Sequence, residues 1–452
     1  METMDALLKL HTDDYEQAEH FLYALPKFTK KRALSDVKRM TEYLSFSGKE
    51  VPMIHVAGTN GKGSVCAYLQ SFLMKRSLRV GMFTSPHLVR MTERFNVSSE
   101  DATDAEFMEA FFAIRKLAEE DYAKTGSFPT FFEFLFLMAI VYFRKKKVDV
   151  IIWETGLGGR LDATNVFEGP DISVITAIGL DHCKYLGDTV EKIAWEKAGI
   201  IKTDSFVVYD RTKQPAAEVI QTQIREKNAR DCGLDAGDTT ILKISEKNID
   251  FSYNSRYYNN AIFHVAHGLY QPENISLALR AAECFFDRND LTQLSESEAD
   301  EAIGATLWPG RMEEIAEDVF FDGAHNSHGV RAFLRSVEAM GKGSNSLCFS
   351  VVNDKDYDEM VGLLHDSGYF DRVLAVEMPE DRGLTETELQ ELFSRFPDWD
   401  VTYCSGIEEA VMWCKGQIRS QAVDTTEKRR VYVVGSLYLV GLFKGYIKEG
   451  HR

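Results

Sequence analysis

Short apolar runs alternate with helix-like segments along the first half of the chain. β-branched and aromatic residues dominate five runs, at 51–57, 79–84, 148–153, 172–179 and 205–209. Apolar residues between the runs recur at helical spacing. They form one stripe just after the first run: Val65, Tyr68, Leu69, Phe72 and Leu73. Strands that alternate with helices are typical of βαβ units, so the pattern predicts a mainly parallel sheet.

The pattern changes at residues 240–266, where alternating apolar and polar residues predict a small antiparallel β insert. A helix is expected from about Asn274 to Phe286, and the Pro–Gly pair at 309–310 then interrupts the pattern. Strand-like runs resume at 318–321, 346–352, 372–377, 400–403 and 430–434. We therefore expect two domains: a larger one over residues 1–306 and a smaller, Rossmann-like α/β domain over residues 307–452.

Composition excludes several classes of protein. Of the 452 residues, 44% are hydrophobic and 27% charged, which is typical of a globular protein and not of collagen or a disordered tail. The formal charge of -18 does not favour binding to nucleic acid or to an anionic membrane. The seven cysteines form no CxxC pair, and the first residues lack the pattern of a signal peptide. We expect reduced thiols and a cytoplasmic protein.

The longest apolar stretch, residues 128–143, contains Glu133 and is too short to span a bilayer comfortably. It predicts a buried helix that ends in the charged run 144–147.

A glycine-rich segment, GTNGKGS, lies between the first expected strand and the helix that follows it. Its residues are Gly58, Thr59, Asn60, Gly61, Lys62, Gly63 and Ser64. Glycines let backbone N–H groups turn toward a phosphate, the helix N-terminus adds positive charge, Lys62 can reach the β- and γ-phosphates, and Ser64 can ligate Mg²⁺. The residue pattern of this segment departs from the GxxxxGK[ST] motif. Its position between a strand and a helix nevertheless favours a phosphate loop over an ordinary turn.

Four further polar clusters follow expected strands, at 84–87, 154–160, 181–182 and 322–326. Each has a purely structural interpretation, as a turn, a surface acid or a core histidine. Because the carboxyl ends of parallel strands form one ligand crevice, we expect the clusters to converge with the phosphate loop. A hard cation there would bind Ser64, Ser85 and Glu154, and His182 could serve a second ion. From the residues alone, Lys197 is a solvated charge on an amphipathic helix.

Eight motifs together resemble the folylpolyglutamate synthase/dihydrofolate synthase family of the Mur ligase superfamily. They are GTNGKGS, SPHL at 85–88, ETGLGGRLDATN at 154–165, LDH at 180–182, LGDTVEKIAWEKAGIIK at 186–202, PGRME at 309–313, DGAHN at 322–326 and GSLYLVG at 435–441. They occur in the family's order. The chain departs from the family's pattern at 95–102, which bears on the preferred pterin.

The resemblance implies an ATP-dependent ligase that joins L-glutamate to a folate, and in some members to dihydropteroate, through an acyl phosphate. Residues 1–306 would form the ATP-binding domain and 307–452 the glutamate-ligase domain. ATP and two Mg²⁺ ions are implied, with small molecules as the partners. We expect a monomer. A Mur-type ligase for another carboxylate, a phosphate-loop NTPase that makes no amide, and a nucleotide-binding module that has lost catalysis are the alternatives.

The resemblance also implies roles for single residues. It implies that Ser64, Ser85 and Glu154 bind the first Mg²⁺. The second would be bound by His182 and by Lys197 as a carbamate. Lys62, Lys197, His182 and His325 would be catalytic. Asn274, Arg311 and Asp322 would contact the nucleotide. The substrates would contact Ser85, His87, Asp322, His325 and Ser436.

Overall fold

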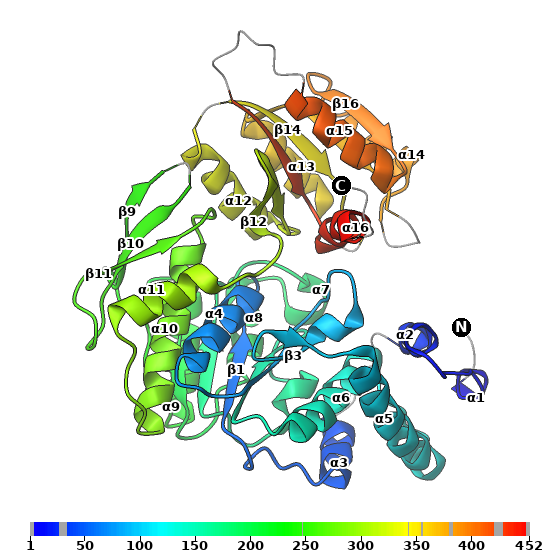
Figure 1. The fold of residues 1–452 in the computed structure, drawn as a ribbon, viewed down its shortest axis with the longest axis vertical. Coiled ribbons are helices and arrows are strands. Elements are labelled where there is room, and N and C mark those ends of the chain that lie inside the picture. The colour runs from blue at the N-terminus through cyan, green and yellow to red at the C-terminus, as the bar shows by residue number, and fades with distance from the viewer. Residues whose placement is uncertain are drawn as a thin grey trace.

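The computed structural model describes residues 4–26, 34–245, 247–341, 343–353, 356–378, 383–419 and 428–448. Two α/β regions lie one above the other in Figure 1. The N-terminal region (residues 4–305) lies below, and the C-terminal region (residues 311–448) lies above it.

An eight-stranded sheet organises the N-terminal region, in the order β4-β3-β2-β5-β1-β6-β7-β8. The parallel strands are β1 (Met53–Ala57), β2 (Val80–Phe83), β5 (Val150–Glu154), β6 (Ile172–Ile175), β7 (Phe206–Val208) and β8 (Arg230–Asp231). The five expected strands are all present, so the mainly parallel sheet is confirmed. A hairpin of β3 (Phe95–Val97) and β4 (Glu100–Asp101) extends one edge, which the sequence pattern did not predict.

Helices cover both faces of this sheet, which explains why its strands are apolar throughout. One face packs on α4 (Lys62–Met74) and α10 (Gln271–Arg288), through residues such as Ile54 and Leu69. The other face packs on α2 (Tyr15–Ala24), α3 (Ser35–Tyr43), α5 (Asp104–Thr125) and α6 (Phe131–Lys146). Helix α6 is the buried helix that the apolar stretch predicts. Within the described residues, no helix is long and apolar enough to cross a membrane.

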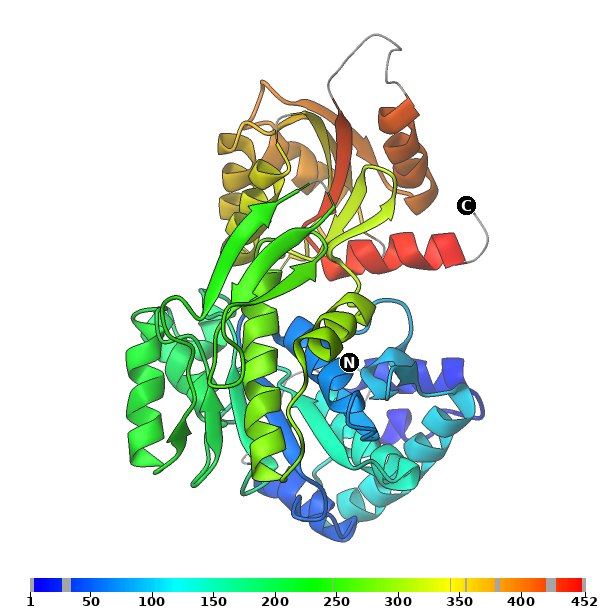
Figure 2. The same cartoon turned by 60° about the vertical axis from the view of Figure 1, so that its left-hand side comes forward.

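The remaining elements of this region flank the sheet. They are α1 (Met4–Leu7), α7 (Cys183–Leu186), α8 (Val190–Ala198), α9 (Ala216–Glu226) and α11 (Glu296–Ala305). The predicted insert is a three-stranded antiparallel sheet of β9 (Thr239–Ile244), β10 (Ile249–Tyr253) and β11 (Ala261–Val265). Side chains of β11 are alternately buried and exposed, as the pattern requires. Figure 2 shows this small sheet beside α10.

A six-stranded sheet forms the C-terminal region, in the order β12-β13-β17-β14-β15-β16. The strands are β12 (Arg311–Ala316), β13 (Val319–Asp322), β14 (Ser344–Phe349), β15 (Phe370–Val376), β16 (Asp400–Cys404) and β17 (Arg429–Val434). All are parallel except the edge strand β12. The second α/β sheet is confirmed, whereas the division at residue 306 into independent domains stays a prediction.

In the described part of the C-terminal region, five helices cover the two faces of the smaller sheet. One face packs on α12 (Ser327–Ala339), α13 (Tyr357–Asp366) and α14 (Glu386–Phe393). The opposite face packs on α15 (Ile407–Arg419) and α16 (Leu437–Lys448). Helix α16 lies along the boundary between the two regions in Figure 2. Its Gly441 packs so closely on the Leu88 carbonyl of the N-terminal region that a Cβ would collide there.

Candidate active site

A cavity of about 510 Å³ lies where the carboxyl ends of the larger sheet face the C-terminal region. The N-terminal region contributes the phosphate loop and the segments after β2, β5 and β6, including Ser85, Glu154 and His182. Arg311 and His325 line it from the C-terminal region. The polar clusters therefore meet the phosphate loop at one edge of the sheet, as the strand-end argument expects.

The phosphate loop joins β1 to α4, and its glycines are needed where it touches its neighbours. Gly61 has a φ of 88°, and a Cβ there would collide with Asn274 Oδ1. A Cβ on Gly58 would collide with Thr176 Oγ1. At Gly61, only glycine allows both the left-handed backbone and the close approach to Asn274. The loop is thereby held against β6 and α10, with α4 starting at Lys62.

Two lysines converge on the carbonyl of Gly58. Lys197 Nζ donates to this oxygen at 2.7 Å, and Lys62 Nζ lies 3.2 Å from it. Helix α8 buries Lys197 because Ile193 and Ala194 lie on the same helical face. Burial lowers the pKa of Lys197 to about 7, and the charge of Lys62 adds to the effect. A large fraction of this amine is therefore neutral at neutral pH.

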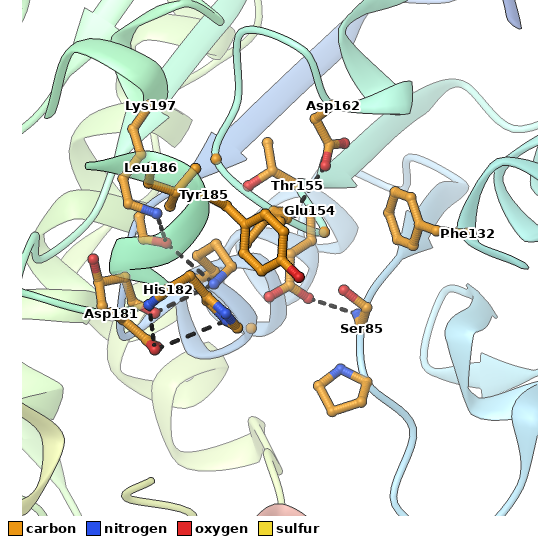
Figure 3. Close-up of a pocket in the computed structure, with 18 of the residues that line it drawn as sticks. Ser85, Phe132, Glu154, Thr155, Asp162, Asp181, His182, Tyr185, Leu186 and Lys197 are labelled. Carbon is orange, nitrogen blue, oxygen red and sulfur yellow. Dashed lines mark hydrogen bonds and ion pairs between the residues drawn. The ribbon is translucent and has the colours of Figure 1, made fainter. Parts of the chain in front are cut away.

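The residues expected to bind the first Mg²⁺ have the chemistry for it. Ser64 Oγ is buried and has no hydrogen-bond partner among the residues that the structure describes. Glu154 is 3% exposed, and burial raises its pKa against the opposing effect of Lys62, so the carboxylate would gain from a cation. Its Oε2 accepts the Ser85 N–H at 2.9 Å (Figure 3). These oxygen donors suit a hard cation.

Nowhere in the described part of the chain do three or more His, Cys, Asp or Glu residues gather as a metal site. A cation here would therefore depend on the serine hydroxyls and on oxygens of the nucleotide as well as on Glu154.

Asp181 joins two histidines that belong to different regions of the chain. Its Oδ1 lies 3.9 Å from His182 Nε2, and its Oδ2 lies 3.7 Å from His325 Nε2. Figure 3 shows Asp181 and His182 on one side of the cavity, with Glu154 and Ser85 across from them. His325 Nδ1 lies 2.7 Å from the Gly323 carbonyl. Because a carbonyl only accepts, Nδ1 carries the proton, and Nε2 is the basic nitrogen of the neutral ring.

Known proteins share both this sequence and this fold. No protein-family model matches the chain. The Bacillus subtilis protein named dihydrofolate synthase/folylpolyglutamate synthase is 34% identical over 364 residues, which cover 77% of this chain and 82% of that protein. The chain belongs to the folylpolyglutamate synthase/dihydrofolate synthase family.

Two solved structures of this family extend the likeness to the whole fold. Mycobacterium tuberculosis folylpolyglutamate synthase, complexed with ADP and AMPPCP, has a TM-score of 0.84 and 27% identity, covering 96% of this chain and 98% of that one. An Escherichia coli protein in complex with DHPP and ADP has a TM-score of 0.81 and 26% identity, covering 98% of this chain and 99% of that one.

Sequence reasoning missed one wall of the cavity in this family member. Tyr23, Arg94, Phe131 and Phe132 line this wall. Tyr23 stacks on Phe131 with ring centroids 5.6 Å apart, and the Arg94 guanidinium lies 5.4 Å above the same ring. The one available signal was Pro129–Thr130 before a Phe pair, which marks the capped start of α6. An aromatic wall of this kind suits a flat, conjugated ligand.

Several predicted residues lie behind the lining and hold it in place. His87 lies between Tyr23 Oη, at 2.9 Å, and Arg94 Nε, at 2.8 Å. Asp322 Oδ2 accepts from the Tyr270 hydroxyl at 2.5 Å and from the Met312 N–H at 3.0 Å.

Ser64, Asn274 and Ser436 are likewise buried behind the cavity surface. Asn274 lies directly under Gly61, and Ser436 Oγ accepts the Tyr438 N–H at the start of α16. The other predicted residues line the cavity: Gly58, Thr59, Asn60, Gly61, Lys62, Gly63, Ser85, Glu154, His182, Lys197, Arg311 and His325.

Proposed function

We propose that this protein is an ATP-dependent ligase that joins L-glutamate to a carboxylate of a pterin-bearing acceptor. The observation that carries the proposal is a single cavity with a phosphate loop on one wall and stacked aromatic rings with Arg94 on another. The names of the relatives support it, since they are folylpolyglutamate and dihydrofolate synthases. The complex of the Escherichia coli relative with DHPP and ADP supports the binding of a nucleotide together with a second small molecule.

The reaction divides into two balanced steps. An oxygen of the acceptor carboxylate attacks the γ-phosphorus of ATP, and ADP leaves, which gives an acyl phosphate. The glutamate amine then attacks the acyl carbon, an amide bond forms, and inorganic phosphate leaves. When bound, Mg²⁺ would neutralise the phosphate oxygens and so lower the barrier to phosphoryl transfer.

The chain's own residues orient the reactants and move protons. Lys62 stabilises the transferring phosphoryl group from the loop side, and Arg311 approaches it from the C-terminal region. His325 presents Nε2, its basic nitrogen, and takes a proton from the attacking amine. Phe131 and Phe132 exclude water from the acceptor side.

We assign the metal and substrate contacts as follows. Ser64, Ser85 and Glu154 hold one Mg²⁺, and His182 with a carbamylated Lys197 holds another. Carbamylation needs a neutral amine, which the buried position of Lys197 supplies.

The phosphate loop and Arg311 line the cavity and contact the nucleotide, and Asn274 and Asp322 support these contacts from behind the cavity surface. Ser85 and His325 contact the substrates, and His87, Asp322 and Ser436 hold the substrate site in place from behind the cavity surface. Residues 1–306 act as the ATP-binding domain and 307–452 as the glutamate domain. The protein acts as a cytoplasmic monomer on small molecules, without nucleic acid or membrane.

The test is glutamate-dependent ADP release at saturating ATP and Mg²⁺, with dihydropteroate or tetrahydrofolate monoglutamate as acceptor and mass detection of the product. We expect a product one glutamate residue heavier from tetrahydrofolate monoglutamate. Product from dihydropteroate as well would make the protein bifunctional. Steady ATP hydrolysis with no heavier product from either acceptor would contradict the proposal.

A further inference from the structure

The C-terminal region touches the phosphate loop directly, through the first turn of α12. Asn60 Nδ2 lies 2.9 Å from His328 Nδ1 and 3.2 Å from Asn326 Oδ1. In turn, Asn326 Nδ2 donates one hydrogen bond to Asn60 Oδ1 at 3.2 Å and another to Asp181 Oδ2 at 2.9 Å. One asparagine of the phosphate loop is thus bound by two side chains from the other region.

The contact with Asn60 requires that Nδ1 of the His328 ring accept a hydrogen bond. An amide group has two N–H donors, and those of Asn60 go to Asn326 Oδ1 and to His328 Nδ1. A protonated imidazole has no acceptor, so the ring must be neutral. Burial lowers the pKa of His328, and the nearby charges of Arg335, Lys213 and Arg331 act in the same direction. The surroundings therefore favour the neutral form that the contact needs.

His328 also packs tightly on Gly179, a residue that supports the phosphate loop. A Cβ added to Gly179 would lie 2.7 Å from Cβ of His328, so the imidazole rests on this glycine. Gly179 in turn binds Thr59 of the loop twice, since its N–H donates to Thr59 Oγ1 and its carbonyl accepts from the same hydroxyl, both at 3.1 Å. His328 is absent from the cavity lining and is not expected to touch the nucleotide.

We propose that His328 is a positioning residue that fastens the phosphate loop to the C-terminal region through Asn60. The contact exists only while the two regions lie together, so nucleotide affinity is coupled to their apposition. This inference rests on the proposed function, in that the loop is taken to bind the nucleotide.

The test measures ADP binding by calorimetry, which needs no turnover and stays readable if glutamate ligation is not found. His328→Leu removes the acceptor and should weaken ADP binding roughly three- to tenfold, the effect of one lost hydrogen bond. His328→Asn places an amide oxygen near the position of Nδ1 and should stay within about twofold of the wild type. His365→Leu is the control, because His365 lies on α13 and binds Asp398 in the loop before β16, outside the cavity.

Two more variants separate positioning from loss of structure. Gly179→Ala displaces the ring without removing it and should weaken ADP binding in the same direction as His328→Leu. In an Asn60→Ala background, His328→Leu should add nothing, since the contact has already gone. Unchanged ADP affinity in His328→Leu would overturn the proposal. So would equal weakening by His328→Asn and His328→Leu, or a further loss in the double variant.

Discussion

Gly61→Ala tests whether the phosphate loop acts through its backbone shape. Gly61 has a φ of 88°, which costs an alanine about 1 to 2 kcal/mol. The new methyl group would also collide with Asn274 Oδ1. That side chain is buried, and its Nδ2 donates to Gln271 Oε1 at 3.0 Å, so it has little freedom to move. The loop must therefore shift.

A displacement of about 1 Å in a positioning element costs roughly a hundredfold in rate. We accordingly expect kcat/KM for ATP to fall about a hundredfold in Gly61→Ala, which corresponds to a loss of about 3 kcal/mol of transition-state stabilisation. The assay is glutamate-dependent ADP release across a range of ATP concentrations.

Gly237→Ala is the matched control. Gly237 has a φ of 93°, and no atom of the described part of the chain lies within 4 Å of an added Cβ. It therefore carries the backbone strain without the collision and should lower the melting temperature but preserve kcat/KM. If the kcat/KM values of the two variants agree within about threefold, strain alone accounts for the effect and the positioning argument is refuted.

Three further changes have defined outcomes. Lys62→Ala should lower the rate of ADP release by roughly 100- to 1,000-fold, as expected for loss of a donor that stabilises developing charge, and should leave the melting temperature unchanged. Near-normal turnover would contradict the assignment of residues 58–64 as a phosphate loop. Lys197, whose pKa is about 7, is neutral above that pH, so CO₂-depleted enzyme should regain activity with bicarbonate at pH 8 and much less at pH 6; indifference to bicarbonate would exclude the carbamate. Burial raises the pKa of Glu283 to about 7, so its stabilising contribution is present below pH 4.5 and is lost as the pH rises through 7. The melting temperature of Glu283→Gln relative to wild type should therefore increase from pH 5 to pH 8, and a flat difference would contradict the shift.

The parallel strands were predictable because both faces of each sheet are covered, which leaves continuous apolar runs in the sequence. The β3–β4 hairpin was not predictable from the sequence. Its turn uses Ser98 and Ser99 at φ values of 51° and 70°, in the left-handed region where Gly or Asn usually announces a turn. Strand β8 has only two residues, too few for any periodic pattern.

Site residues at strand ends were predictable for a geometric reason, since parallel strands bring their carboxyl ends to one edge. Arg94 and Phe131 were not, because their roles depend on how α6 and the segment after β2 pack. A phenylalanine at the start of a buried helix has the same sequence pattern whether it faces the core or a ligand. Lys197 shows the converse: its spacing predicts a solvated charge, whereas the structure leaves it 4% exposed.

Transfer of an acceptor oxygen to phosphate tests the central claim most directly. The acceptor is prepared with ¹⁸O in the reacting carboxylate and incubated with ATP, Mg²⁺ and L-glutamate, and the released phosphate is analysed by mass. Ligation through an acyl phosphate predicts one ¹⁸O in each phosphate released, in step with formation of the glutamylated product. Phosphate free of ¹⁸O, with ADP formed in the absence of glutamate, would show that the cavity hydrolyses ATP without activating a carboxylate.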